Sequence, residues 1–292
     1  MGDLSSGGAG RLVAVTAASG QLGRRVAARV AAAGLAQRLV VRDAARAPRL
    51  PATDVAVADY ADAAAMRAAL TGVDTVLLIS AGEAADRVAL HTTAVDAAVA
   101  AGVRHLVYVS FLGAAPDATF TFARDHWHTE RHIERTGLPR TFLRDSLYLD
   151  VLPHFVGADG VLRGPAGDGR VAAVARDDVA DVAAAILADP GPHAGRTYDV
   201  TGPVAFTLAE AAGALTAATG RIITYHPESL EEAYASRERF GAPRWAVDGW
   251  VTSYAAIATG ELDVVSDTVR TVAGHPPMTF AELLAAHPPR LA

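Results

Sequence analysis

Short apolar runs alternate with alanine-rich helical stretches through the first half of the chain, and this alternation constrains the fold more than any other feature. The apolar runs are, in order, RLVAV, RLVV, DVAVADY, DTVLLIS, HLVYVS and RTFLRD. Strands separated by helices of about 10 to 15 residues pair in parallel, because a crossover helix must return the chain to the same edge of the sheet. The sequence therefore predicts an α/β fold built on a doubly wound parallel sheet.

The alternation ends about halfway along the chain, and this break predicts how the chain is divided. Residues 11–150 form the expected parallel-sheet domain. Residues 170–202 return to it through the helix ARDDVADVAAAILADP and the strand RTYDVTG. We expect Asp177 or Asp178 to supply the N-cap of that helix. Residues 203–292 are expected to form a smaller, mainly helical portion that covers the substrate.

The composition excludes several kinds of chemistry. The chain has 26 basic residues, all of them arginine, and it has no cysteine. Lysine Schiff bases, a P-loop lysine, thiolate nucleophiles and cysteine-ligated metals are therefore impossible. A net charge of −6 argues against nucleic acid or an anionic membrane as the partner. Residues 1–10 lack the apolar segment of a secretory signal and are expected to be disordered. We expect a cytoplasmic protein with a small-molecule substrate. The sequence leaves open whether the protein forms a homodimer.

The segment VAVTAASGQLG, between the first strand and the first helix, predicts a dinucleotide-binding turn. It spaces three small residues, Ala17, Gly20 and Gly23, at intervals of three. In such a turn the first makes the bend, the second lets the backbone approach the pyrophosphate, and the third lets helix and strand pack closely. Because alanine disfavours positive φ, we expect a negative φ at Ala17. The predicted cofactor-binding residues here are Ala18, Ser19, Gly20, Gln21 and Leu22.

Residues after the next three strands predict contacts with the rest of the dinucleotide. Arg42 follows the second strand directly, where arginine suits a ribose 2′-phosphate and an acidic residue suits a 2′-hydroxyl. A solvated surface arginine is the alternative. Asp59 and Tyr60 are expected to frame the adenine. Ser80 and Gly82 are expected to face the nicotinamide ribose, although a short turn explains them almost as well. The predicted cofactor is NADP(H).

A family resemblance rests on eight segments in a fixed order. They are VTAASGQLG, VVRDAARA, VADYAD, GVDTVLLIS, AAVAAGVRHLVYVS, HTERHIERTGLPRTFLRDSLY, GPAGDGRVAAVARDD and YDVTGP. They extend from about Leu12 to Pro203, and over this range the chain resembles atypical short-chain dehydrogenases/reductases of the NmrA-like group, close to bacterial NAD(P)H:quinone oxidoreductases. The resemblance implies a Rossmann-type fold, NADPH binding and hydride transfer.

The catalytic pair of the wider superfamily is missing. There the catalytic helix reads Tyr-x-x-x-Lys-x-x-x-Glu, and the same spacing here gives Phe122, His126 and Glu130. The tyrosine donates a proton to the developing alkoxide, which Phe122 cannot do. We expect His126 to face the cofactor ribose or the substrate carbonyl in place of the lysine. Tyr148, after the sixth strand, is the second predicted catalytic residue. Ser110 is expected beside the cofactor, although the spacing leaves open which residue holds the superfamily's serine position.

Three functions remain open from the sequence. The favoured one is an NADPH-dependent oxidoreductase that reduces a quinone or a conjugated carbonyl. A non-catalytic, NADP-sensing regulator is the alternative, and a lyase or epimerase that keeps its cofactor bound is the third. His128 and His132 share a helix face as zinc ligands would, but no third ligand accompanies them. The sequence therefore predicts no metal site.

Overall fold

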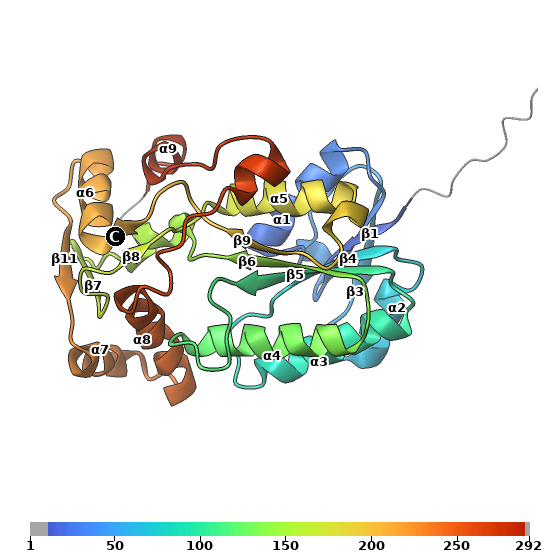
Figure 1. The fold of residues 1–292 in the computed structure, drawn as a ribbon, viewed down its shortest axis with the longest axis horizontal. Coiled ribbons are helices and arrows are strands. Elements are labelled where there is room, and N and C mark those ends of the chain that lie inside the picture. Colours follow the sequence, from blue (N-terminus) through green and yellow to red (C-terminus); the bar gives the residue numbers. More distant parts are fainter. Residues whose placement is uncertain (1–10, 290–292) are drawn as a thin grey trace, which may run out of the picture.

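The computed structural model describes residues 11–289, and a parallel sheet of seven strands lies at its centre (Figure 1). The strands are β1 (Val13–Val15), β2 (Gln37–Val41), β3 (Thr53–Val57), β4 (Thr75–Ile79), β5 (His105–Phe111), β6 (Arg140–Asp145) and β9 (Thr197–Val200). Their order is β3-β2-β1-β4-β5-β6-β9, and each neighbouring pair is parallel. The order reverses between β1 and β4, where α/β sheets of this kind bind their ligands. The predicted doubly wound sheet is confirmed.

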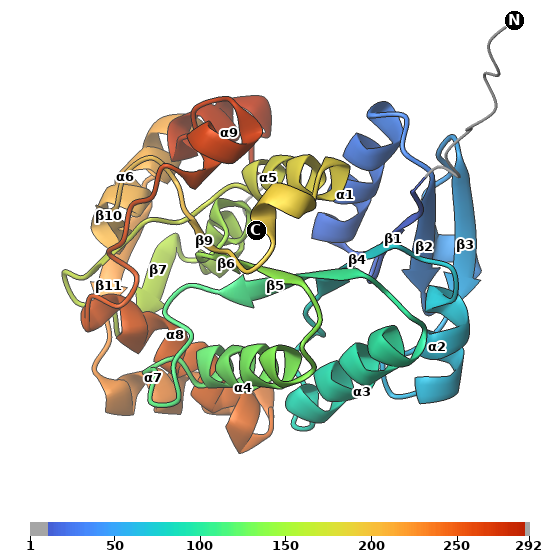
Figure 2. The ribbon, with the colours of Figure 1, turned by 45° about the vertical axis from the view of Figure 1, so that its right-hand side comes forward.

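Helices cover both faces of this sheet (Figure 2). One face carries α1 (Gln21–Ala32) and α5 (Arg176–Ala188), and the other carries α2 (Ala63–Leu70), α3 (Arg87–Ala100) and α4 (Thr121–Arg135). Each face has its own core because alternate residues of a strand point to opposite sides. On β6, for example, Leu143 packs with α1 and α5, whereas Phe142 packs with the helices of the opposite face.

The chain after β6 builds a second portion at the carboxyl ends of the strands, toward which the arrow of β5 points in Figure 1. Its strands are β7 (Val161–Gly164), β8 (Arg170–Val171), β10 (Phe206–Thr207) and β11 (Thr224–Pro227), paired as β7–β11 and β8–β10. Its α-helices are α6 (Leu208–Thr219), α7 (Leu230–Arg237), α8 (Arg244–Ala258) and α9 (Phe280–Ala286). Short helical turns are η1 (Ala44–Arg46), η2 (Leu149–Phe155), η3 (Gly191–His193), η4 (Glu238–Phe240) and η5 (Val269–Ala273).

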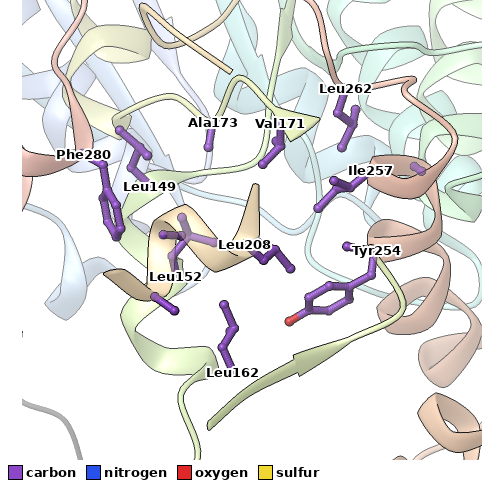
Figure 3. Packing of buried hydrophobic residues seen from close by; sticks show 14 of the residues in the cluster. Leu149, Leu152, Leu162, Val171, Ala173, Leu208, Tyr254, Ile257, Leu262 and Phe280 are labelled. Atoms are coloured by element: carbon purple, nitrogen blue, oxygen red, sulfur yellow. The ribbon is translucent and has the colours of Figure 1, made fainter. Parts of the chain in front are cut away.

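This second portion has its own apolar core (Figure 3). Leu162 of β7, Leu208 of α6 and Tyr254 of α8 meet there with Leu149 and Leu152 of η2. Since η2 follows β6 directly, this core continues from the end of the central sheet. The second portion is thus held at the edge where the cofactor turn also lies.

Two details differ from the expectations or lie outside them. The helix α5 is capped by Ala175, and Asp177 and Asp178 both lie in its first turn. The predicted aspartate N-cap is therefore wrong, although acidic groups in a first turn still favour the helix dipole. The expected disorder of residues 1–10 concerns a segment outside the described residues. Within residues 11–289, no helix has the length and apolarity needed to cross a bilayer.

Candidate cofactor and active site

The turn between β1 and α1 has the geometry of a phosphate-binding loop. Gly20 is the N-cap of α1, and no side chain caps the helix, so the first N–H groups remain for a ligand. The N–H of Gly20 closes the turn by donating to the Ala17 carbonyl at 2.8 Å. A Cβ at Gly23 would overlap the Ala17 carbonyl oxygen and the Ala18 backbone. Only glycine therefore allows helix and strand to come this close.

The backbone at Ala17 contradicts the expected negative φ. Its φ is +48°, in the left-handed region that non-glycine residues rarely adopt. This conformation costs an alanine about 1–2 kcal/mol, so the turn holds a strained residue where other dinucleotide turns have glycine. The tight bend requires a positive φ at this position, whichever residue is present. The expectation of a negative φ was wrong because it was based on the conformational preference of alanine and not on the geometry of the turn.

Residues after β2 and β3 partly match their expected positions. Arg42 follows the last residue of β2 and is exposed, and within residues 11–289 nothing pairs with its guanidinium. Asp43 does not compete with it, because its carboxylate caps η1 by accepting from the Ala45 N–H. Asp59 is exposed, and its carboxylate accepts from the Ala61 N–H at 2.9 Å. A free guanidinium therefore follows β2 directly, as the sequence predicts for a residue that would bind a ribose 2′-phosphate.

Tyr60 lies beneath the switch point between β1 and β4. Its hydroxyl is 2.5 Å from the Oγ1 of Thr16 and donates to the Ile79 carbonyl at 2.7 Å. Burial raises the pKa of this phenol well above its usual value. Its polar end therefore holds β1, β4 and the loop after β3 together, which leaves only the ring for a contact with adenine.

The loop after β4 contains Ser80, which is half-buried, and Gly82, which is exposed. It is tied to the second portion by the Trp250 indole N–H, which donates to the Glu83 carboxylate at 2.9 Å. Because Trp250 belongs to α8, this contact links the crevice above β4 to the C-terminal helices.

Phe122, at the position of the superfamily tyrosine, is a packing residue. Its side chain is 9% exposed, and its ring contacts those of Phe120 and Trp245. A Cβ placed on Gly249 of α8 would lie 2.5 Å from the ring, so the two backbones can approach only because that residue is glycine. The proton-donor position of the superfamily is thus filled by hydrocarbon and covered by α8.

A cation nevertheless reaches this place, from α3. Arg87 is 7% exposed, and its guanidinium lies 5.5 Å from the centre of the Phe122 ring. It donates to the Ala81 carbonyl at 3.0 Å and to the Nε2 of His126 at 2.9 Å. Arg87 therefore places a positive charge beside the position where the superfamily has lysine, and sequence reasoning missed it because the charge comes from another helix.

The contacts of His126 settle its tautomer. Since arginine can only donate, the Nε2 of His126 accepts and its Nδ1 carries the proton, which it donates to the Tyr108 hydroxyl at 2.9 Å. His91 has the same tautomer, because its Nε2 accepts from the Ala81 N–H at 2.8 Å. Burial, followed by the charge of Arg87, lowers the pKa of His91 to about 3 and that of His126 well below its usual value.

This environment does not fit the expected role of His126. Both of its ring nitrogens bind groups of the protein, and a neutral imidazole with a depressed pKa is a poor acid at neutral pH. The side chain is 4% exposed. His126 therefore holds Arg87 and Tyr108 in place, and we assign it no proton transfer.

Ser110 points into the protein, away from a cofactor contact. Its hydroxyl donates to the Glu130 carboxylate at 2.6 Å, and Arg144 of β6 binds the same carboxylate through two nitrogens. Glu130 is fully buried, so it depends on these partners. The third residue of the superfamily register therefore joins α4 to β5 and β6.

Tyr148 lies just beyond the end of β6 and is paired with the last residue of that strand. Its hydroxyl donates to the Asp145 carboxylate, and the Arg176 guanidinium lies 4.4 Å from the centre of its ring. Asp145 is 4% exposed, and this burial raises its pKa to about 7. Sequence analysis singled out Tyr148 but not the state of Asp145, because only burial makes that carboxyl unusual.

A cavity of about 210 Å³ lies beside Leu149 of η2 and is smaller than the ~300–1,000 Å³ usual for ligand sites. Its lining includes Leu149, Ala173, Val204, Phe206, Ala211 and Phe280. It therefore does not by itself define a substrate pocket.

Of the two histidines considered for zinc, His132 binds Asp96 at 2.7 Å and His128 is exposed.

The observed turn fits a dinucleotide. An uncapped helix start, a glycine that a Cβ would block and a free guanidinium after β2 lie at the same edge of the sheet. These features meet the phosphate and ribose requirements of a nicotinamide cofactor. When bound, such a cofactor supplies hydride.

Comparisons with known proteins agree with this geometry. Residues 17–190 match the NAD(P)H-binding family. The chain is 35% identical to quinone oxidoreductase 2 of Escherichia coli (strain K12), over 82% of this chain and 84% of the relative. It is also 35% identical to the NAD(P)H azoreductase of Xenophilus azovorans, over 84% of this chain and 87% of that one.

Solved structures are similar over almost the whole chain. The NADPH complex of the Escherichia coli NADPH-dependent quinone oxidoreductase has a TM-score of 0.85 at 33% identity, covering 94% of this chain and 99% of that one. The negative transcriptional regulator NmrA has a TM-score of 0.76 at 18% identity, covering 96% of this chain and 95% of that one, and shows a shared fold alone. The chain therefore belongs to the NAD(P)H-binding family and is an NmrA-like oxidoreductase of the short-chain dehydrogenase/reductase superfamily.

Proposed function

We propose that this protein transfers hydride from NADPH to a quinone or a similarly conjugated acceptor. The observation that carries the proposal is Phe122, which leaves the proton-donor position of the superfamily without a phenol and covered by α8. An isolated ketone becomes a strongly basic alkoxide on hydride addition and needs a positioned acid, worth about 10²–10⁴-fold in rate. A quinone becomes an aromatic hydroquinone anion, which is phenol-like and far less basic. The negative charge on this anion therefore needs less stabilisation by a positioned acid.

The relatives support the same substrate class. Two proteins that are 35% identical to this chain are named as a quinone oxidoreductase and as an azoreductase. Quinones and azo groups are both conjugated acceptors that take up two electrons. The regulator NmrA is only 18% identical to this chain, so the similarity shows a shared fold and does not support the alternative function of a non-catalytic sensor.

We further propose that NADPH is preferred over NADH. Arg42 supports this, because its guanidinium is free and follows β2, where the 2′ substituent of the adenosine ribose lies in this fold. A phosphate accepts two hydrogen bonds from a guanidinium, whereas a hydroxyl at that position offers no charge to pair with. The pyrophosphate would be held by the N–H groups that start α1.

Purified protein with NADPH and a naphthoquinone provides the test. Loss of the reduced-nicotinamide absorbance in proportion to the enzyme present, with hydroquinone as the product, is expected. Tight NADPH binding without any such loss, over a panel of quinones and azo dyes, would contradict the proposal and favour the sensor. Binding is followed by the fluorescence of the reduced nicotinamide, so the two properties are measured separately.

A further inference from the structure

The carboxyl end of β6 holds a buried acid–phenol pair, Asp145 and Tyr148. The phenol donates its hydrogen bond to the Asp145 carboxylate, and the pair lies where β6 ends, at the carboxyl edge of the sheet, outside which such folds bind their ligands. Asp145 is 4% exposed, and Tyr148 is half-buried.

Charged groups from three elements face the pair: Arg176 at the start of α5, Arg87 at the start of α3 and Asp150 of η2. Burial is the largest influence on Asp145 and raises its pKa to about 7, although the Tyr148 hydrogen bond and the charges of Arg176 and Arg87 oppose it. Burial, and then the nearby Asp145 charge, raise the pKa of Tyr148 well above its usual value. The phenol therefore keeps its proton at neutral pH, and the carboxyl beside it can carry one.

A neighbouring hydroxyl indicates that a ligand belongs at this place. Ser146 lies next to Asp145 and is 1% exposed, and its Oγ has no hydrogen-bond partner within residues 11–289. Leaving a buried hydroxyl without a partner is energetically unfavourable. Polar groups in this state are expected where a bound molecule completes the site.

We propose that Tyr148 is the proton donor of the reduction and that Asp145 resupplies it, an inference that rests on the proposed function. The hydride, with its two electrons, reaches the quinone from the reduced cofactor and leaves an oxygen anion. When Asp145 is protonated, its O–H donates to the phenol oxygen, and the phenol O–H is free to donate to the substrate oxygen. Tyr148 then transfers the proton of its hydroxyl to that oxygen and receives the proton of the Asp145 carboxyl. Asp145 then takes a proton from water. The sum is one quinone, one NADPH and one proton converted to one hydroquinone and one NADP⁺.

Asp145 acts through Tyr148 and is a positioning residue, so its test is a pH profile. For the wild type, kcat/KM with a naphthoquinone is expected to fall as the pH rises through about 7. Asp145→Asn should lower kcat/KM about tenfold at pH 6 and flatten the profile. Asp178→Asn is the matched control, because Asp178 of α5 is also buried and also has a raised pKa, and its profile should equal that of the wild type.

A second variant and a spectroscopic readout guard against a folding defect. Tyr148→Phe should lower kcat by about tenfold while NADPH binding changes less than about twofold. The infrared band of a protonated carboxyl should be present in the cofactor-free wild type at about pH 6, and Asp145→Asn should remove it.

The possible failures are distinguishable. If the wild type oxidises no NADPH with any quinone, the proposed function fails, and this inference fails with it. If the wild type turns over but Asp145→Asn keeps its pH profile, or Tyr148→Phe keeps its kcat, only the inference is overturned. A protonated-carboxyl band of Asp145 that appears only below pH 5 would overturn it independently of activity.

Discussion

The ring of Phe122 packs directly on the backbone of Gly249, so closely that a Cβ there would lie 2.5 Å from it. Phe122 belongs to the Rossmann portion and Gly249 to the C-terminal α8. Phe122, which the spacing of the superfamily motif aligns with the catalytic tyrosine, therefore joins the two portions of the molecule.

Gly249→Ala is expected to destabilise the protein by about 1–3 kcal/mol, because the added methyl group overfills a packed contact. Gly213→Ala is the matched control, since Gly213 lies in α6 and a Cβ there meets nothing within 4 Å. It should be neutral or stabilise by up to about 1 kcal/mol, as alanine favours a helix. Urea unfolding of both variants measures this. Equal effects would mean that the Phe122–Gly249 contact is loose.

Arg42→Ala should weaken NADPH binding about ten- to a hundredfold and leave NADH binding nearly unchanged. A charge-assisted hydrogen bond of about 1.5–3 kcal/mol accounts for this range. Arg270→Ala, which removes an exposed arginine of η5, controls for the general change in charge. Dissociation constants come from nicotinamide fluorescence. Equal losses for the two cofactors would remove Arg42 from the 2′-phosphate site.

His126 makes the protein sensitive to acid. Its pKa is far lower in the folded than in the unfolded chain, so below about pH 6.5 only the unfolded chain gains a proton there, and stability falls as the pH falls. Between pH 7.5 and 5.5 this linkage costs about 1.4 kcal/mol.

The comparison of unfolding free energies isolates this effect from other titrating groups. His126→Gln should reduce the pH-dependent loss by that amount, whereas His128→Gln, at an exposed position of the same helix, should not change it. A wild-type pH dependence in His126→Gln would show that the imidazole is accessible and titrates, which would reopen its catalytic role.

Ala17→Gly is expected to be tolerated far better than Ala33→Gly. Ala17 has a φ of +48°, where glycine relieves about 1–2 kcal/mol of strain, whereas Ala33 has a right-handed helical backbone. Glycine adds unfolded-state entropy of about 0.5–1 kcal/mol at either position. The two variants should therefore differ by at least about 1 kcal/mol in thermal or urea unfolding. A smaller difference would indicate that the turn relaxes around alanine.

The fold was predictable because each strand of the central sheet up to β6 corresponds to a short apolar run in the sequence. β6 matches the sequence RTFLRD residue for residue, and the other predicted runs lie within a few residues of β1 to β5. The N-cap of α5 was not predictable, because Asp177 and Asp178 serve equally well two and three residues after it, within the first turn, where they bind arginines of α1 or the Met278 N–H. Tertiary contacts decided between cap and first turn.

The site was predictable only as far as local chemistry determines it. The spacing of the superfamily motif identified Phe122, His126 and Glu130 as the residues to consider. Their contact partners, however, come from β5, β6, α3 and α8, and spacing within one helix does not predict them. The position of Arg87 beside His126 arises from the packing of α3 on α4, and the raised pKa of Asp145 arises from burial; no motif records either. The one relevant signal in the sequence was the absence of lysine: a positive charge at the position of the superfamily's lysine could come only from an arginine or a protonated histidine.

The central claim is that this chain reduces acceptors whose anions need little acid catalysis. The most direct test compares kcat/KM, with NADPH as the donor, for a naphthoquinone and for an unactivated cyclic ketone, in the wild type and in Phe122→Tyr. We predict that the quinone is preferred by at least about 10²-fold, and that Phe122→Tyr does not rescue the ketone, because the new hydroxyl is buried beneath α8 without the superfamily's lysine. Reduction of the ketone at a rate comparable to that of the quinone would contradict the account.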